Sequence, residues 1–322
     1  MSSYQFTYSI YQRQFRQPLH TSHGIWEVRA GIIIYLTDDV GRAHAGEIAP
    51  IPWFGSESVA QAIEWCQQIG DQITADQINL IPNRLPACQF GFGSALAAFD
   101  PDLSIIGGAS ILENQDLLEI SALLPTGTAA IDAWQTLWTQ GYKTFKWKIG
   151  VAEIDLELAI WGQLMAALPP AAKLRLDANG GLTYSEAAQW LKICSQEPRI
   201  EFIEQPLAPH LIAETILLAQ ISVNELADIC ATPLALDESV ATFDRLQVIY
   251  NQGWRGIYVI KPGIAGFPWR LSEFIIQHQL DVVFSSVLET SIGRTAAFNL
   301  ASGLQLQRAM GFGIDAWFED DF

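Results

Sequence analysis

Three carboxylates at matching positions are the first candidates for chemistry in this sequence. Asp177, Glu204 and Asp237 each end a short apolar segment, and stretches long enough for a helix separate these segments. Any one of them alone is most simply a helix cap or a turn residue, but three at the same position in successive segments favour a shared cation site. Because these ligands are hard oxygens with no His or Cys nearby, they select Mg²⁺ or Mn²⁺ over zinc.

The lysines form a second candidate group. The chain contains only six, and three of them lie between positions 143 and 148. Lys146 and Lys148 are two residues apart in a segment that predicts a strand, so their side chains share one face. Phe145 and Trp147 take the other face, which favours lysines that point into the protein over an edge strand with solvated lysines. Lys261 ends a later apolar segment and is expected on the opposite side of the site.

Amines beside a bound divalent cation indicate removal of a proton from carbon. A lysine titrates at about 10.4, which is too high for a base at neutral pH. A second ammonium group, a metal ion and burial all favour the neutral amine. The cation can also stabilise the dianion that forms when a carbon next to a carboxylate loses its proton. The residues therefore predict proton abstraction alpha to the carboxylate of a small-molecule substrate.

The elements that would hold these side chains alternate between strand and helix. Strands are expected at residues 119–124, 144–149, 173–177, 200–204, 234–237, 256–261, 281–285 and 311–314, with helical stretches between them. This α/β alternation favours a parallel sheet, and eight strands favour a closed (β/α)8 barrel, whose active site lies at the carboxyl ends of its strands. An open dinucleotide-binding sheet is disfavoured because Gly91-Phe-Gly93 follows no strong strand.

The sequence predicts two domains. Residues 1–105 are expected to form an α+β domain, and residues 106–322 the barrel, which ends in a very short tail. In the first domain, strands are expected at residues 5–12, 26–37 and 41–48. A helix capped at Ser56 and another helix at residues 92–99 should follow.

The composition disfavours several classes of partner. Acidic residues outnumber basic ones by 35 to 18, and the net charge of −17 disfavours binding to nucleic acid or to an anionic membrane surface. The cysteines form no CxxC pair, no apolar window is long enough to span a bilayer, and the first residues lack the apolar core of a signal peptide. We therefore expect a cytoplasmic, monomeric enzyme with reduced thiols.

Five short motifs resemble the muconate-cycloisomerase subgroup of the enolase superfamily. They are Lys146-Trp-Lys148, Asp177-Ala-Asn179, Glu204-Gln-Pro206, Asp237-Glu-Ser239 and Lys261-Pro262. Within this subgroup the chain is most similar to the o-succinylbenzoate synthase family. Residues 46–52 resemble part of that family's capping domain, and residues 285–293 resemble its loop after the seventh strand. The resemblance covers nearly the whole chain and implies an enolase-type barrel with an N-terminal cap.

The resemblance also implies a role for each motif. The Mg²⁺ ligands, with Mn²⁺ as an alternative ion, would be Asp177, Glu204 and Asp237. Lys148 would remove the proton, Lys261 would stabilise the enediolate and the ring as a cation, and Lys146 would favour the neutral form of Lys148. The implied reaction is the syn dehydration of 2-succinyl-6-hydroxy-2,4-cyclohexadiene-1-carboxylate to 2-succinylbenzoate in menaquinone or phylloquinone biosynthesis. Lys148 would return its proton to the departing hydroxyl.

Four further residues are candidates for substrate binding or for support of the site. Asn179 could support the metal site or simply begin the turn that follows it. Ser286 and Gly293 lie where a loop could donate hydrogen bonds to the succinyl carboxylate. Arg29 belongs to a segment that could cover the mouth of the barrel.

Other functions stay open. An N-succinylamino-acid racemase, a dipeptide epimerase and a cycloisomerase of the same subgroup would share the metal and lysine set. Dipeptide epimerases typically carry a DxD motif after the eighth strand, whereas Gly313-Ile-Asp315 offers a single Asp. A non-catalytic binding protein on this scaffold is disfavoured, because buried ammonium groups are costly without a purpose.

Overall fold

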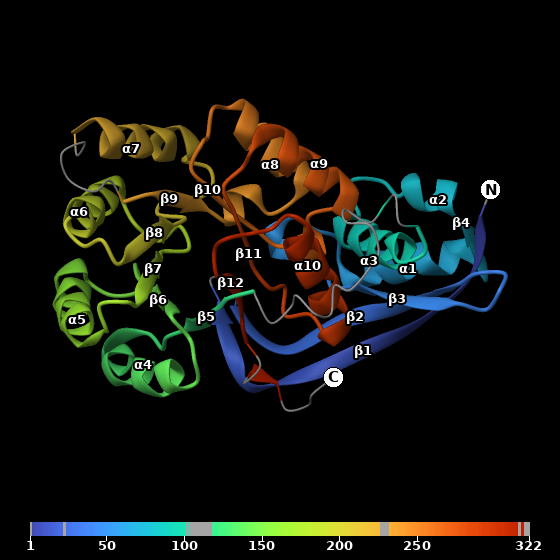
Figure 1. The fold of residues 1–322 in the computed structure, drawn as a ribbon, viewed down its shortest axis with the longest axis horizontal. Coiled ribbons are helices and arrows are strands. Elements are labelled where there is room, and N and C mark those ends of the chain that lie inside the picture. The colour runs from blue at the N-terminus through green and yellow to red at the C-terminus, as the bar shows by residue number, and fades with distance from the viewer. Residues whose placement is uncertain are drawn as a thin grey trace.

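A computed structural model describes residues 2–21, 24–100, 103, 118–225, 232–314 and 317–318 of the chain. Two sheets organise the molecule, a four-stranded antiparallel sheet near the N-terminus and an eight-stranded parallel sheet after it. In Figure 1 the N-terminal sheet and its helices extend to the right, and most of the parallel strands, with the helices around them, lie to the left.

The N-terminal sheet contains a strand much longer than expected. Its order is β3-β2-β1-β4, and its strands are β1 (Ser3–Thr21), β2 (Gly24–Thr37), β3 (Ala43–Ile48) and β4 (Gln72–Thr74). β1 continues past residue 12 because Tyr11, Arg13 and Phe15 alternate as buried side chains and keep one face covered. The long β1–β2 pair thereby reaches from the cap to the barrel (Figure 1).

Three helices complete the cap. They are α1 (Val59–Ile69), α2 (Ala75–Asn79) and α3 (Pro86–Ala97). Helix α3 begins at Pro86 rather than at residue 92, because proline is tolerated in a first turn, where its missing N–H has no helical partner. It packs closely against β3: a Cβ on Gly46 would lie 2.0 Å from the carbonyl oxygen of Gly91. Its other side meets the barrel, since a Cβ on Gly93 would lie 2.8 Å from Pro268.

The N-cap of α1 is Ser58, so the expectation for Ser56 was wrong. Ser58 Oγ accepts a hydrogen bond from the Gln61 N–H, and the Gln61 side chain accepts one from the Ser58 N–H, which makes a capping box. Ser56 Oγ instead accepts a hydrogen bond from the Ile51 N–H at 2.7 Å. Serine is a favoured N-cap residue at either position. Ser58 is the cap because the hydroxyl of Ser56 already binds the Ile51 N–H.

The predicted (β/α)8 barrel is confirmed. Its strand order is β11-β10-β9-β8-β7-β6-β5-β12. The strands are β5 (Ile120–Leu123), β6 (Thr144–Lys148), β7 (Lys173–Asp177), β8 (Ile200–Glu204), β9 (Leu234–Leu236), β10 (Ile257–Ile260), β11 (Val282–Phe284) and β12 (Met310–Gly313). Neighbours in this order pair in parallel, and a parallel bridge between Ser285 and Gly311 joins β11 to β12.

Helices cover the outside of the barrel (Figure 1). They include α4 (Ala130–Thr139), α5 (Ile154–Ala167), α6 (Tyr184–Cys194), α7 (Ile212–Glu225), α8 (Phe243–Asn251), α9 (Pro268–His278) and α10 (Ser291–Gly303). On β6, Phe145 packs on Trp138 of α4 and Trp147 on Trp190 of α6, both with ring centroids 6.5 Å apart. The predicted alternation of β6 is thus confirmed, and its lysines face the barrel interior.

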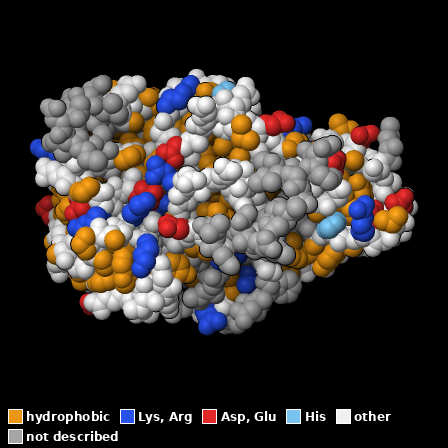
Figure 2. Space-filling view, viewed as in Figure 1, with side chains coloured by type: hydrophobic (Ala, Val, Ile, Leu, Met, Phe, Trp, Pro, Cys, Tyr) orange, Lys and Arg blue, Asp and Glu red, His pale blue; other side chains and the backbone are white. Residues whose placement is uncertain are grey.

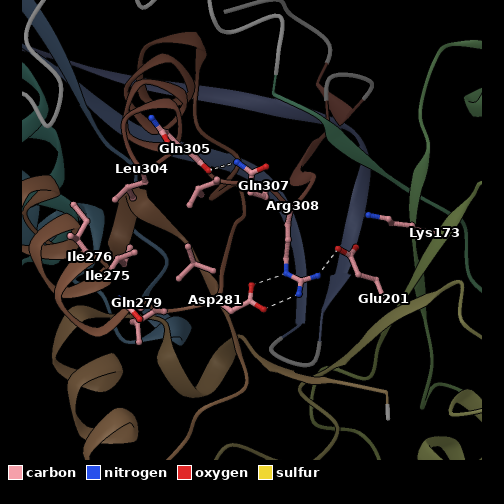
Figure 3. Close-up of a pocket in the computed structure, with 13 residues that line it drawn as sticks. Lys173, Glu201, Ile275, Ile276, Gln279, Asp281, Leu304, Gln305, Gln307 and Arg308 are labelled. Carbon is pink, nitrogen blue, oxygen red and sulfur yellow. Dashed lines mark hydrogen bonds and ion pairs between the residues drawn. The ribbon is translucent and has the colours of Figure 1, made fainter. Parts of the chain in front are cut away.

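An ion-pair network crosses the floor of the barrel, at the amino ends of the strands. Arg308, which precedes β12, donates hydrogen bonds of 2.7 and 2.8 Å to Asp281 and one of 2.8 Å to Glu201 (Figure 3). Glu201 also pairs with Arg175 of β7 at 2.7 Å. A cavity of about 540 Å³ lies beside this network. The network links β7, β8, β11 and β12 and so reinforces the region in which the barrel closes.

The surface in view carries both signs of charge. Basic and acidic side chains are interspersed on the face shown in Figure 2. Within the described ranges, no helix has the length and apolar character needed to cross a membrane.

Candidate active site

The strands bring the three predicted carboxylates to one end of the barrel. In the parallel register, Lys148 of β6 is opposite Asp177 of β7, and Asp177 is opposite Glu204 of β8. Glu204 is in turn opposite Ala235, two residues before Asp237. Asp177, Glu204 and Asp237 therefore lie at the carboxyl ends of adjacent strands, and all three are buried.

Two lysines offset part of this negative charge. Lys146 Nζ lies 2.8 Å from Asp177 Oδ2 and 2.7 Å from Glu204 Oε1. Lys261 Nζ forms an ion pair with Asp237 Oδ1. Lys148 differs from both: in the part of the chain that the structure describes, it forms no ion pair.

The buried carboxylates perturb one another. Burial and then the charge of Asp177 raise the pKa of Glu204 to about 8, although Lys146 acts in the opposite direction. For Lys146 burial acts to lower the pKa, but the charges of Asp177 and Glu204 outweigh it and raise that pKa. The cluster therefore lacks positive charge, which a divalent cation would supply.

The donor set fits Mg²⁺, since it consists of buried carboxylate oxygens at adjacent strand ends. Among the described residues, no three His, Cys, Asp or Glu side chains surround a common point suited to a metal ion. The ion pairs explain this arrangement, because the carboxylates turn toward Lys146 and Lys261. A cation would compete with these ammonium groups for the same oxygens.

A cavity of about 290 Å³ lies over the cluster. The barrel supplies the polar part of its lining, and Trp53 and Phe54 of the cap supply an apolar part. Lys261 Nζ is 4.2 Å from the ring centroid of Phe54, within the range of a cation–π contact. Lys146, Lys148 and Lys261 all line this cavity, so half of the six lysines of the chain face one space.

Asn179 was expected either to support the metal site or to begin a turn, and the structure shows features of both. Its φ of 43° is left-handed, as in a turn residue. Its N–H donates to Asp177 Oδ1 at 3.1 Å, and its side-chain amide donates to Glu238 Oε1 at 3.0 Å. Asn179 also lines the cavity. It therefore forms the turn and at the same time orients a carboxylate of the cluster.

Gln205 is a supporting residue that the sequence reasoning did not assign. It is fully buried, and its φ of 38° turns the chain sharply after Glu204. Its side-chain oxygen accepts hydrogen bonds from the N–H groups of Asp237 at 3.1 Å and Ser239 at 3.2 Å. The sequence did carry a signal for this supporting role: Gln205 is a polar residue that directly follows a predicted ligand and precedes a proline. Gln205 thus joins the end of β8 to the segment that carries Asp237.

Ser286 and Gly293, the two candidates for substrate binding that follow β11, lie in different places. Ser286 lines the cavity, and its hydroxyl donates to Glu289 Oε2 at 2.9 Å and accepts from the Leu288 N–H at 2.8 Å. Gly293 is not among the cavity-lining residues, because it lies on α10 and donates its N–H to Glu47 Oε2 at 2.9 Å. Ser286 stays a candidate for substrate binding, and Gly293 contacts the cap instead.

Arg29 does not reach the cavity either. It is buried and donates hydrogen bonds to the carbonyl oxygens of Val287, Ala30 and Pro50. Its guanidinium thus ties the cap to the loop after β11. Arg29 was expected in a segment that covers the mouth of the barrel. Its hydrogen bonds to buried carbonyl groups instead hold its side chain in the interface between the cap and the barrel.

The segment after β12 contacts the cap as well. Phe318 forms an antiparallel bridge with Phe15 of β1, and the two rings stack with centroids 4.8 Å apart. Arg13 lies 3.7 Å from the Phe318 ring centroid. The short tail therefore reaches β1 beside the cavity, where Trp317 is a lining residue. Asp315 lies outside the described residues.

Two family models match the sequence, one on each sheet. The family described as "MenC, N-terminal domain" matches residues 8–99, and the family described as "Enolase C-terminal domain-like" matches residues 129–321. An o-succinylbenzoate synthase of Thermosynechococcus vestitus is 40% identical over 313 residues, which cover 96% of this chain and 92% of the relative. One of Yersinia enterocolitica is 33% identical over 267 residues, which cover 80% of this chain and 74% of the relative.

Solved structures share the fold. The crystal structure of o-succinylbenzoate synthase from Thermosynechococcus elongatus, complexed with Mg in the active site, has a TM-score of 0.84 and 38% identity, and the match covers 97% of this chain and 94% of that one. The L-Ala-D/L-Glu epimerase of Bacillus subtilis has a TM-score of 0.75 and 20% identity, with 100% and 92% covered. The second likeness shows the fold alone.

Proposed function

The chain belongs to the o-succinylbenzoate synthase family of the enolase superfamily, and we propose that it catalyses the syn dehydration of 2-succinyl-6-hydroxy-2,4-cyclohexadiene-1-carboxylate to 2-succinylbenzoate. This reaction would serve menaquinone or phylloquinone biosynthesis. The observation that carries the proposal is a cavity lined by Lys148, Lys261 and Asp177, with Glu204 and Asp237 buried at the neighbouring strand ends.

The carboxylates would hold the metal ion. Asp177, Glu204 and Asp237 would bind Mg²⁺, with Mn²⁺ as a substitute. When bound, the ion would place positive charge on the substrate carboxylate and so make the neighbouring C–H group more acidic. The Mg-bound relative supports this assignment. Asn179 and Gln205 would keep the carboxyl-bearing segments oriented.

Lys148 would be the base. It lines the cavity and, within the described residues, is not held by a carboxylate, so its amine is free to approach the substrate. It would take the proton from the carbon next to the carboxylate and then give it to the hydroxyl, which leaves as water while the ring becomes aromatic. Because one amine performs both transfers, proton and hydroxyl leave from the same face. Lys146 would keep its charge beside Asp177 and Glu204.

Lys261 would act through its charge. It is buried, paired with Asp237 and in contact with the ring of Phe54. An ammonium group in this position would stabilise the negative charge of the enediolate and the face of the aromatising ring. Trp53 and Phe54 would supply the apolar wall for that ring.

The direct test is an assay of the purified protein with Mg²⁺ and the cyclohexadiene substrate. We expect 2-succinylbenzoate to appear, followed by its aromatic absorbance and confirmed by mass spectrometry. The dehydration proposal would be wrong if the metal-loaded, folded protein left this substrate unchanged above the uncatalysed rate.

Racemisation of N-succinylamino acids is a second candidate activity. The observation in its favour is that Lys148 and Lys261 both line the cavity, and that Lys148 ends β6 while Lys261 directly follows β10 on a different side of the barrel. Two amines could exchange a proton on opposite faces of one carbon. Incubation of an N-succinyl-L-amino acid in D₂O tests this candidate, because racemisation would give deuterated D product, and an unlabelled, optically pure substrate would refute it.

We further propose that the protein acts in the cytoplasm as a monomer. Three buried, unpaired thiols, at Cys66, Cys88 and Cys194, support a reducing compartment. The oligomeric state is tested by the mass measured in size-exclusion chromatography with light scattering, for which we expect the 35.6 kDa of one chain.

A further inference from the structure

Glu47, in β3 of the cap, is a buried carboxylate whose hydrogen-bond donors come mostly from the barrel. Its oxygens accept from the Tyr11 hydroxyl at 2.5 Å, from Thr290 Oγ1 at 2.5 Å, from the Thr290 N–H at 3.0 Å and from the Gly293 N–H at 2.9 Å. Tyr11 belongs to the cap, whereas Thr290 and Gly293 open helix α10 of the barrel. A carboxylate only accepts hydrogen bonds, so it matches a set composed entirely of donors.

The contact is specific to the beginning of α10. Thr290 is the N-cap of this helix, and its hydroxyl accepts a hydrogen bond from the Ile292 N–H. The free N–H groups of a first helical turn favour a negative charge, which Glu47 provides from another domain. A Cβ on Gly293 would lie 2.8 Å from Glu47 Oε2, so glycine gives the carboxylate room to approach.

The segment just before this contact forms a wall of the cavity. Ser285, Ser286 and Leu288 line it, and Leu288 has a left-handed φ of 63°. A non-glycine residue in that conformation persists where the surrounding structure holds it. Thr290 lies two residues after Leu288, so Glu47 fixes the end of the loop that presents these side chains.

We infer that Glu47 is a positioning residue: from the capping domain it holds the loop of residues 285–290 in the conformation that forms one wall of the substrate cavity. The consequence for turnover rests on the proposed function. The proposed metal ligands and reacting lysines lie on, or directly after, strands β6 to β10, whereas this loop follows β11 and carries none of them. Loosening the loop should therefore weaken substrate binding more than it slows the chemical steps.

The test substitutes Glu47 by Gln and compares it with a matched control, Glu57→Gln. Glu57 is also a buried carboxylate of the cap that accepts hydrogen bonds at a helix start, from the N–H groups of Ala87 and Cys88. That helix belongs to the cap, so Glu57 has the same chemistry without the link to the barrel loop. In Glu47→Gln, an amide NH₂ would face donors, and we expect KM to rise about tenfold with kcat changed less than about threefold. Glu57→Gln should leave KM near that of the wild type.

Hydrogen–deuterium exchange gives a readout that needs no turnover. Amides of residues 285–293 should exchange faster in Glu47→Gln than in the wild type, by about tenfold, and should be unchanged in Glu57→Gln. Because the exchange arm is independent of the reaction, it decides on Glu47 even in a preparation that makes no 2-succinylbenzoate. Wild-type exchange of this segment in Glu47→Gln would overturn the inference, and so would equal acceleration in the two variants.

A second variant covers the case in which Glu47→Gln fails to fold. Thr290→Val keeps the shape of the side chain but removes the hydroxyl that donates to Glu47 and accepts the capping hydrogen bond from the Ile292 N–H. We expect a smaller effect of the same kind, with KM raised about threefold and faster exchange in residues 285–293. Unchanged KM together with unchanged exchange in this variant would overturn the inference.

Discussion

Arg308 on the barrel floor should affect stability without affecting catalysis. In Arg308→Met the apolar stem is kept and the charge is lost. The pair with Asp281 contributes about 0.5 kcal/mol, because that carboxylate is 49% exposed. The bond to Glu201, which is 6% exposed, contributes about 1.5 kcal/mol. The loss is no larger than this because Arg175 still pairs with the Glu201 carboxylate in the variant. We expect a loss of about 2 kcal/mol in the free energy of unfolding.

The size of the chain converts this loss into a temperature. For 322 residues the entropy of unfolding is about 0.7 kcal/mol per degree, so Tm should fall by about 3 °C. Calorimetry measures the shift, and kcat and KM should stay at wild-type values because the network lies at the opposite end of the barrel from the cavity. The matched control is Arg42→Met, which breaks the pair between the exposed Arg42 guanidinium and Asp38 and should lower Tm by less than about 1 °C. Equal shifts in the two variants, or a loss of turnover in Arg308→Met, would refute this reasoning.

The other predictions concern the cavity. Chelation with EDTA should abolish turnover and Mg²⁺ should restore it, and activity that survives exhaustive chelation would contradict the metal assignment. Asp237→Asn should weaken Mg²⁺ binding in calorimetric titrations, whereas Glu238→Gln should change it little; equal losses would mean that both carboxylates bind the ion. Lys148→Ala and Lys148→Arg should both lower kcat by several orders of magnitude, because a guanidinium cannot act as a base; near-normal kcat in the arginine variant would exclude Lys148 as the base. Lys261→Arg should keep more activity than Lys261→Ala because it keeps the charge, and wild-type kcat in the alanine variant would contradict the role of Lys261.

Local sequence patterns, such as the alternation of residue types along a strand, made the barrel predictable. On β6 the alternation of lysine with aromatic residues assigned both faces correctly, because the aromatic rings pack on helices and leave the lysines inside. The acidic residues at the strand ends were correctly expected to lie close together. Parallel strands in register place Asp177 and Glu204 side by side.

Contacts between distant segments were not predictable in this way. The first strand was expected to end at residue 12, yet β1 continues and Arg13 in its second half is buried beside Phe318. Arg29 and Gly293 were expected near the substrate, and both instead join the cap to the barrel. In each case a polar group is satisfied by a partner hundreds of positions away, and no local spacing records that partner.

The uneven placement of lysine makes this chain suited to chemical labelling. Lys143, Lys173 and Lys192 are exposed, and Lys146, Lys148 and Lys261 line the cavity. An amine-acylating reagent therefore meets two groups of sites, of which one reports on bulk solvent and the other on access to the cavity. The ratio of the two yields, read by peptide mass spectrometry, would measure occupancy of the cavity by a bound ligand without any assay of turnover.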